Sequence, residues 1–225
     1  MATEMQRNGI KEAKVAITGY AKSAFSPSAF SAELFEDKRP VILYNPHWQA
    51  HRSSWPVWGR RLIDALVQQN RWNVIFAPHQ RIVDTDPSVR VLVDSLKMLP
   101  HVHADLDGFS MVDGSYTGMA DIYLGDTSSQ ILEFVAKPRP VVLLRPQELS
   151  WAEQDSGQYA LLGECVTSFE DIIPAIDRAA GQLEKYREMQ ISYAGRTLGL
   201  TGQAATQSAV DVINTYLPTN PATKR

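Results

Sequence analysis

The sequence predicts an α/β fold in which one parallel sheet is flanked by helices. Short apolar runs alternate along the chain with longer segments whose apolar residues recur at helical spacing. Pro, Gly and Asn mark many of the boundaries between the two kinds of segment. This alternation is typical of strands joined by right-handed helical crossovers, as in a single Rossmann-like domain.

The expected strands are mostly continuous apolar runs, because helices cover both faces of a parallel sheet. They are bounded by residues that favour turns. The runs that fit are Val41–Tyr44, Trp72–Phe76, His101–Ala104, Asp121–Leu124, Val141–Leu144 and Cys165–Val166. A further short strand is expected near the start of the chain, over Lys14–Thr18.

The expected helices carry apolar residues on one face. In Trp58–Gln69, Leu62 and Leu66 lie one turn apart on the same side. Apolar residues at helical spacing also follow Ser128, and this helix is expected to end at the two prolines of Lys137–Pro140. The other helical segments are Val89–Lys97, a small turn or helix at Ser115–Met119, Phe169–Ala180 introduced by Ser168, Leu183–Ser192 and Gln203–Tyr216.

The length of the chain suits one large domain. It has 225 residues, 44% of them apolar, which is enough for a sizeable core but too few for two full Rossmann-like halves. We expect an N-terminal strand and linker over residues 1–39, the Rossmann-like domain over 40–217 and a polar tail over 218–225. Lys22–Ser31 has the composition of a linker, and Arg145–Ala160 that of a long polar loop.

Composition excludes several classes of partner and site. The formal net charge is −3 and no basic run stands out, so no nucleic-acid partner is expected. The single Cys165 excludes an internal disulfide and a cysteine-only zinc site, and it suits a reducing cytoplasm. No stretch reaches the roughly 20 apolar residues of a membrane span, and Met1–Lys14 lacks the pattern of a signal peptide.

Polar residues follow three of the expected strands, within Tyr44–Trp48, Phe76–Arg81 and Leu124–Ser129. Ligands of open α/β sheets bind outside the carboxyl ends of the strands, where these segments converge. The third segment also opens a helix, and a helix start favours an anion such as phosphate. The side chains expected at this rim are His47, His79, Arg81, Asp126, Ser128 and Ser129.

Each of these features also has a plainer interpretation. Asp, Thr and Ser begin many helices without any ligand, and we assign Asp126 mainly to such a cap because a carboxylate repels a diphosphate. His79 alone fits a loop histidine, although Arg81 beside it suits phosphate oxygens. His101 and His103 lack a third ligand at usable spacing, so no metal site is predicted.

Several familiar enzyme signatures are absent from the sequence. There is no G-x-S-x-G elbow, no Walker A loop and no G-x-G-x-x-G fingerprint. The hydrolase, P-loop and ordinary dehydrogenase interpretations therefore lose their main support. No general base is assigned from the sequence, and no cofactor is expected.

Four segments together resemble a known family: Val15–Lys22, Pro40–Gln49, Asn73–Arg81 and Met119–Phe134. In order and spacing they are similar to the C-terminal, donor-binding half of the CDP-glycerol glycerophosphotransferases and their GT-B glycosyltransferase relatives. The last segment, MADIYLGDTSSQILEF, is similar to the A-D-x-L-I-T-D-Y-S-S-x-x-x-D-F hallmark of that family. The departures from the family pattern are Ala21, Asn45, His47, Gln49, Gly125, Thr127 and Glu133.

The resemblance implies a site for a nucleotide-diphosphate donor. Contacts to that donor are implied for His79, Asp126, Ser128 and Ser129. We add Arg81 and His47 from the strand ends, and Thr127 and Glu133 from the same turn and helix, as donor-binding candidates. His79 would stabilise the departing diphosphate and is the catalytic candidate. Thr127 and Glu133 stand where the family has Tyr and Asp, which leaves CDP-, UDP- and GDP-linked donors all open.

The resemblance also implies what the chain does and what it needs. It looks like the donor half of a transferase that moves a glycosyl or glycerophosphate group to a cell-surface polymer or glycan. The acceptor and the base would come from an acceptor-binding domain in cis or in trans, and that domain would bring the cytoplasmic protein to the inner face of the membrane. One alternative is a UDP-N-acetylglucosamine 2-epimerase-like enzyme, because Glu133 is compatible with the D-S-x-G-x-x-E-E turn of those enzymes. The other is a non-catalytic nucleotide-sugar binding module.

Overall fold

The computed structural model describes residues 15–24, 34–147 and 159–217, and the chain divides into two compact units. The larger unit spans residues 27–194, and the smaller combines residues from the start of the chain with residues from 195 onward. The division expected from sequence, at residues 39 and 217, stays a prediction. Within the described ranges, we find no helix with the length and apolar character that a membrane span requires.

The larger unit is built on a six-stranded sheet with the order β3-β2-β1-β4-β5-β6, in which all neighbouring strands are parallel. This confirms the predicted fold class. After β3 the chain crosses to the other side of β1, so the strand order reverses between β1 and β4, and ligands of such folds bind at this switch point. The strands are β1 Val41–Asn45, β2 Asn73–Phe76, β3 Val102–Ala104, β4 Ile122–Gly125, β5 Val141–Leu144 and β6 Glu164–Val166.

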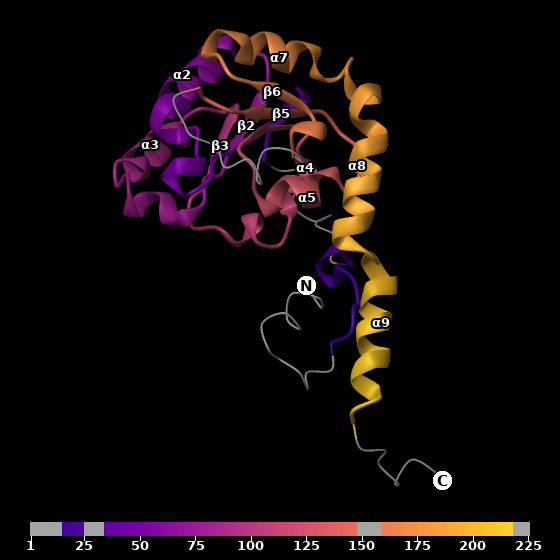
Figure 1. Ribbon diagram of the computed structural model, residues 1–225. Helices are drawn as coiled ribbons and strands as arrows, with labels where there is room; N and C mark the ends of the chain where they lie inside the picture. Colours follow the sequence, from indigo (N-terminus) through magenta and orange to yellow (C-terminus); the bar gives the residue numbers. More distant parts are fainter. Residues whose placement is uncertain (1–14, 25–33, 148–158, 218–225) are drawn as a thin grey trace. The chain divides into compact units, whose positions relative to one another are not determined.

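Helices cover both faces of the sheet (Figure 1). The α-helices of the larger unit are α2 Arg60–Gln69, α3 Val89–Leu96, α4 Ser115–Met119, α5 Ser129–Val135, α7 Ile172–Ala179 and most of α8 Leu183–Leu198. Helix α9 Gly202–Asn214 belongs to the smaller unit. Short helical turns are η1 Ala21–Ala24, η2 Ala50–Arg52, η3 Trp55–Gly59, η4 Gln80–Asp84, η5 Phe109–Met111, η6 Tyr159–Leu161 and η7 Phe169–Asp171.

Several helix boundaries differ from the sequence-based expectation, and three of the differences have a visible form. The segment before α2 is a π-helical turn, η3, so the regular α-helix starts at Arg60 and not at Trp58. The helix expected after Ser168 begins as the 3-10 turn η7, and the hydroxyl of Ser168 bonds to Glu170 instead of capping the helix. Helix α8 continues to Leu198, beyond the expected end at Ser192.

The core consists of two apolar layers, one on each face of the sheet. Alternate strand residues such as Tyr44 and Phe76 pack against α2, α3 and α7 on one face. Their neighbours, such as Leu43 and Tyr123, pack against α4 and α5 on the other. Because successive side chains of a strand point to opposite faces, fully buried strands need apolar residues at every position, as the sequence predicts.

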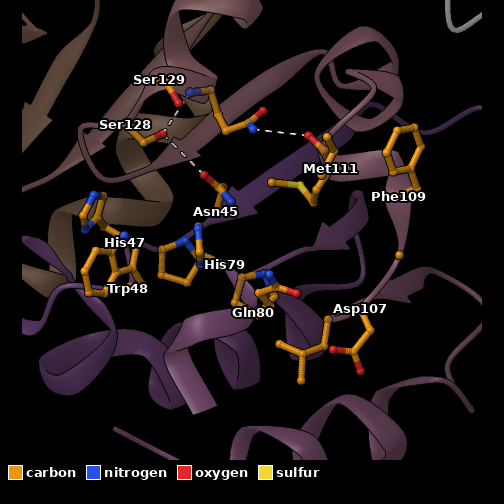
Figure 2. Close-up of a pocket in the computed structure, with 16 residues that line it drawn as sticks. Asn45, His47, Trp48, His79, Gln80, Asp107, Phe109, Met111, Ser128 and Ser129 are labelled. Carbon is orange, nitrogen blue, oxygen red and sulfur yellow. Dashed lines mark hydrogen bonds between the residues drawn. The ribbon is translucent and has the colours of Figure 1, made fainter. Parts of the chain in front are cut away.

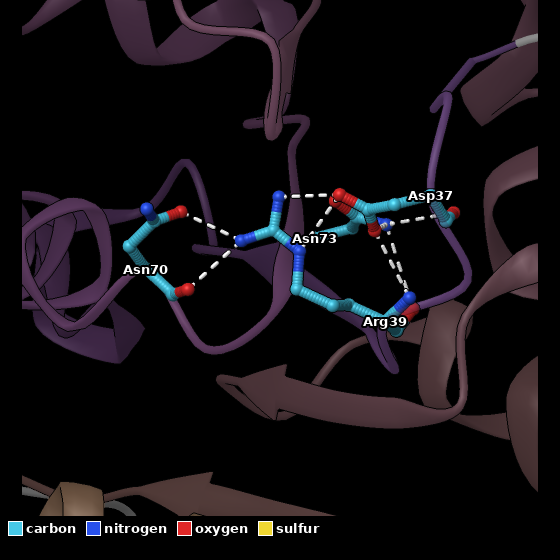
Figure 3. A network of polar contacts seen from close by, with 4 residues as sticks. All are labelled: Asp37, Arg39, Asn70 and Asn73. Carbon is cyan, nitrogen blue, oxygen red and sulfur yellow. Dashed lines mark hydrogen bonds and ion pairs between the residues drawn. The ribbon is translucent and has the colours of Figure 1, made fainter.

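A polar network ties together the amino ends of the central strands (Figure 3). The guanidinium of Arg39 bonds to Asp37 at 2.6 Å and to the carbonyl and side-chain oxygens of Asn70 at 2.8 and 2.6 Å. The amide of Asn73, at the start of β2, donates to Asp37 at 2.9 Å. Hydrogen bonds from Arg39 hold the pKa of the Asp37 carboxyl well below its usual range. This network fixes the entry to β1 at the edge of the sheet opposite the strand ends discussed below.

The smaller unit joins the described N-terminal residues to α9. The backbone of Tyr20 donates to the carbonyl of Leu200 at 2.7 Å, and Tyr20 forms an isolated bridge with Thr201. The strand expected over Lys14–Thr18 is wrong for residues 15–18, because the described residues of this unit contain no strand for them to pair with. Of the expected linker, Lys22–Ala24 lies in η1, and the rest is outside the described residues.

Two other expected segments lie largely or wholly outside the described residues. Of the polar loop Arg145–Ala160, only residues 145–147 and 159–160 are described. The tail 218–225 is not described at all.

Candidate functional site

A cavity of about 500 Å³ lies at the carboxyl ends of β1, β2 and β4. Its walls come from the residues that follow β1, β2 and β3 and from the start of α5 (Figure 2). The position coincides with the switch point in the strand order, where parallel α/β sheets bind their ligands. The sequence-based expectation that polar residues converge at this rim can therefore be checked residue by residue.

The cavity has a polar part and an apolar part. Figure 2 shows His47, Trp48 and His79 toward one end and Phe109 at the opposite end. The polar part is lined by Asn45, His47, His79, Ser128 and Ser129, and the apolar part by Leu106, Phe109, Met111 and Val112. Phe109 is 71% exposed and Val112 58%, so the apolar wall stands open to solvent. The cavity therefore offers hydrogen-bonding groups at one end and apolar surface at the other.

Asn45 joins the three strand ends at the floor of the polar part. Its amide nitrogen donates to the carbonyl of Ala77 at 2.7 Å, just beyond β2. Its side-chain oxygen accepts from the hydroxyl of Ser128 at 3.5 Å, at the start of α5. Asn45 is only 3% exposed, so these bonds hold β1, β2 and α5 in a fixed relation below the cavity.

Ser128 is the cap of α5. Its backbone is extended, with φ −150° and ψ 170°, and its hydroxyl accepts the N–H of Gln130 at 3.2 Å. Tyr123 donates from its hydroxyl to the carbonyl of Asp126 at 2.9 Å and lies 3.2 Å from the Ser128 hydroxyl. The turn between β4 and α5 is thus held from below by a buried tyrosine.

Gly125 departs from the family pattern for a steric reason. A Cβ at this position would lie 2.6 Å from the carbonyl oxygen of Asn45 on the neighbouring strand. Real Cβ atoms do not come so close to a backbone oxygen, so only glycine allows β1 and β4 to approach here. The glycine sets the geometry of the cavity floor.

The assignment of Asp126 to the helix cap is wrong. Its carboxylate is fully buried and accepts the backbone N–H of His47 at 2.8 Å and that of Ser54 at 3.0 Å. Burial raises the pKa of Asp126 to about 7, against the effect of these N–H donors. Asp126 therefore fastens the segment after β1 to the end of β4, and its charge faces backbone amides.

Both cavity histidines use Nδ1 to accept a backbone N–H two residues further along the chain. Nδ1 of His79 accepts from Arg81 at 3.1 Å and caps η4, and Nδ1 of His47 accepts from Gln49 at 3.0 Å. Burial and the nearby charge of Arg81 lower the pKa of His79. Both effects favour the uncharged form of the His79 ring.

Arg81 does not line the cavity. Its guanidinium lies over the ring of Trp48, 3.8 Å from the ring centre, and pairs with Asp84 at 3.7 Å. Trp48 also stacks on His47 at 5.9 Å and lies 6.1 Å from His79. Arg81 thus holds one wall of the cavity in place, which is a different position from the phosphate-facing one that the sequence suggests.

Thr127 and Glu133 also lie away from the cavity lining. Thr127 is 3% exposed, and its hydroxyl has no hydrogen-bond partner among the described residues. Glu133 lies on α5, where its carboxylate sits beside Gly114. Of the candidate residues, the structure gathers His47, His79, Ser128 and Ser129 at the cavity and places Arg81, Asp126, Thr127 and Glu133 around it.

Sequence reasoning missed the loop that follows β3 and closes the apolar side. Asp105 accepts the N–H of Gly108 at 2.8 Å and the hydroxyl of Tyr116 at 2.5 Å, and Tyr116 also bonds to Nε2 of His103 at 2.8 Å. The run Asp105–Gly108 could have indicated a turn in this loop, because Asp and Gly at this spacing favour turns. His103 is therefore part of this hydrogen-bond network. His101 lies elsewhere and is buried, with 7% of its surface exposed.

The described side chains do not form an evident metal centre. Among them, no group of three or more His, Cys, Asp or Glu residues is arranged to hold a metal ion.

Comparison with known proteins gives a likeness of fold. No protein-family model and no curated protein matches the sequence. A sucrose-phosphate synthase from Thermosynechococcus elongatus matches with a TM-score of 0.52 and 15% identity, over 96% of this chain and 56% of that one. The wall teichoic acid polymerase TagF matches with a TM-score of 0.56 and 13% identity, over 80% of this chain and 44% of that one. The spinosyn rhamnosyltransferase SpnG matches with a TM-score of 0.53 and 14% identity, over 89% of this chain and 53% of that one.

These likenesses show that the chain has the α/β fold of GT-B glycosyltransferases. The GT-B fold expected from the sequence is thereby confirmed. The chain spans about half the length of these solved structures. The narrower resemblance to CDP-glycerol glycerophosphotransferases stays a prediction.

Proposed function

We propose that this chain is the nucleotide-donor-binding domain of a GT-B type transferase, which moves a glycosyl or glycerophosphate group to a cell-surface polymer or glycan. The observation that carries the proposal is the cavity at the carboxyl ends of β1, β2 and β4, with two histidines and two serines on its polar side. The GT-B fold supports the same placement of a donor.

The chemistry of the polar part suits a diphosphate. Phosphate oxygens accept hydrogen bonds, and imidazole N–H and serine O–H groups donate them. The Asp126 carboxylate accepts the amides of His47 and Ser54 and does not line the cavity, so it makes no direct contact with an anion there. In transfer, donors fixed in this way stabilise the charge that develops on the departing diphosphate.

The proposal includes a second domain. A transferase of this kind reacts in a cleft, and orienting the acceptor against the donor supplies part of the rate enhancement. We propose that an acceptor-binding domain, in cis or in trans, provides the acceptor and the general base. The same domain would hold the protein at the inner face of the membrane, where a cell-surface polymer is assembled.

Binding and turnover test the proposal separately. CDP, UDP and GDP are titrated into the chain by calorimetry, and melting is followed at the same concentrations. A ligand at about 100 times its dissociation constant raises the free energy of unfolding by roughly 2.7 kcal/mol. Ser129→Ala should weaken binding, and the exposed Asp94→Asn serves as the control. Absence of binding and of any melting shift with all three nucleotides would refute the donor site.

A transfer assay then separates enzyme from module. The chain alone should bind donor without transferring it, and activity should appear when an acceptor-binding domain is added. Binding that never leads to transfer with such a domain present would favour a non-catalytic module. Epimerisation of a nucleotide sugar by the chain alone would overturn the proposal in favour of an epimerase-like enzyme.

A further inference from the structure

The two ring nitrogens of His79 have different surroundings. Nδ1 accepts the backbone N–H of Arg81 at 3.1 Å, in the first turn of η4. A nitrogen that accepts an N–H carries a lone pair, so the proton of the neutral ring resides on Nε2. Within the part of the chain that the structure describes, Nε2 has no protein partner, and the ring lines the cavity beside Trp48 (Figure 2).

Protonation of the ring would disrupt this arrangement. A proton on Nδ1 would face the N–H of Arg81, placing two donors against each other and removing the cap of η4. The guanidinium of Arg81 is held nearby by its stacking on Trp48, and it disfavours a second positive charge.

The other charged groups near the ring come from several elements. Asp84 belongs to η4 and is paired with Arg81. His47 lies in the segment after β1, and Asp107, in the loop after β3, is paired with Arg90 at 3.0 Å. The start of α5 contributes only uncharged side chains to the cavity lining. No described carboxylate in this set contacts the imidazole directly, so none is in place to stabilise an imidazolium.

We propose that His79 meets its ligand as a neutral Nε2–H donor directed at an oxygen of an anionic group, and that it takes up no proton in the reaction. This inference rests on the proposed donor site and states how that site recognises the diphosphate. Since the only lone pair of the ring is committed to η4, His79 does not serve as the general base. Its contribution to binding stays constant across the pH range in which an imidazolium would be lost.

Two substitutions separate the two nitrogens. In His79→Asn, the side-chain oxygen replaces Nδ1 as the acceptor for Arg81, so η4 keeps its cap while the donor at the Nε2 position is lost. In His79→Gln, the longer amide places an N–H near the Nε2 position but leaves the cap unfilled. The exposed His51→Asn, outside the cavity lining, is the matched control.

The variants should behave in opposite ways. A hydrogen bond to a charged group contributes about 1.5–3 kcal/mol, so His79→Asn should weaken binding of UDP, CDP or GDP by about tenfold or more. Its melting temperature should match that of the wild type. His79→Gln should keep most of the affinity and melt at a lower temperature. Full affinity in His79→Asn would overturn the proposal.

The pH dependence of binding gives a second readout. Titrations run from pH 7 to pH 9, where the second ionisation of a terminal phosphate, near pKa 6, is already complete. If His79 is a neutral donor, the pH dependence of the affinity is the same in the wild type and in His79→Asn, because Asp126, whose pKa is raised to about 7, titrates in both. An affinity that falls about tenfold per pH unit, and loses this slope in His79→Asn, would show an imidazolium and refute the inference.

The tautomer itself can be measured without any ligand. Two-dimensional ¹H–¹⁵N spectra of the imidazoles, assigned by the loss of one ring in His79→Asn, should show the Nε2–H form at pH 7.5. An Nδ1–H form or an imidazolium would refute the inference whatever the chain binds. If the Nε2–H form is found and the wild type binds neither pyrophosphate nor any of the three nucleotides, then the donor site fails, and with it the ligand-directed half of the inference.

Discussion

Replacing Asp126 should destabilise the fold well beyond the effect of losing a helix cap. The carboxylate accepts the N–H groups of His47 and Ser54, which come from a segment more than 70 residues earlier in the chain. In Asp126→Ala both N–H groups lose their acceptor, at about 1–3 kcal/mol each. The expected loss is about 2–6 kcal/mol of unfolding free energy, reduced by whatever is gained from no longer burying an ionisable group.

Asp126→Asn should be intermediate. Its oxygen still accepts one N–H, whereas its amide group faces the other donor, so a loss of about 1–3 kcal/mol is expected. Urea unfolding followed by tryptophan fluorescence measures both variants, with the exposed Asp94→Asn as the control. If Asp126→Ala unfolds within about 0.5 kcal/mol of the wild type, then Asp126 does not fasten the two segments.

The pH dependence gives an independent check on Asp126. Its pKa in the folded chain is raised to about 7, from an ordinary value of 3.8. An acid whose pKa is raised by folding binds more protons in the folded state, so its contribution to stability falls as the pH rises from about 4 to about 7. The difference in unfolding free energy between the wild type and Asp126→Asn should therefore shrink between pH 5 and pH 8. A constant difference would contradict the assignment.

Three further substitutions test the walls of the cavity. Gly125→Ala would place a Cβ 2.6 Å from the Asn45 carbonyl, so it should lower the melting temperature and weaken nucleotide binding together. Tyr116→Phe removes the hydroxyl that bonds to Asp105, at a cost of about 1–3 kcal/mol, and hydrogen exchange should speed up in residues 106–112 and not in α2. Arg81→Ala removes a cation–π contact of about 0.5–1 kcal/mol, and it should change the fluorescence of Trp48 with little loss of stability.

Local sequence signals were sufficient for the sheet. Val41–Tyr44 and Val141–Leu144 are apolar at every position, which is what burial on both faces of a parallel sheet requires, and both are strands. The strand expected over Lys14–Thr18 failed for residues 15–18 because an extended segment also needs a neighbour to pair with, and within the described residues 15–24 only Tyr20 forms a bridge. Pairing partners are a property of the whole fold, which a single short run does not specify.

The site was predictable in position and only in part in detail. Convergence of the strand ends follows from parallel topology, so His47, His79, Ser128 and Ser129 were placed from sequence. The role of Asp126 depends on backbone amides far away in the chain, and its neighbours in sequence give no hint of them. The apolar wall after β3 was missed for a similar reason, because its position depends on contacts to Tyr116.

The most direct test of the central claim is a nucleotide titration of the ¹⁵N-labelled chain followed by amide chemical shifts. If the cavity at the strand ends is the donor site, then UDP, CDP or GDP should shift the amides of residues 45, 47, 48, 79–81 and 128–130 in a saturable way. Amides of α2 and α9 should not move. Saturable shifts confined to another surface, or no shifts at millimolar nucleotide, would contradict the account.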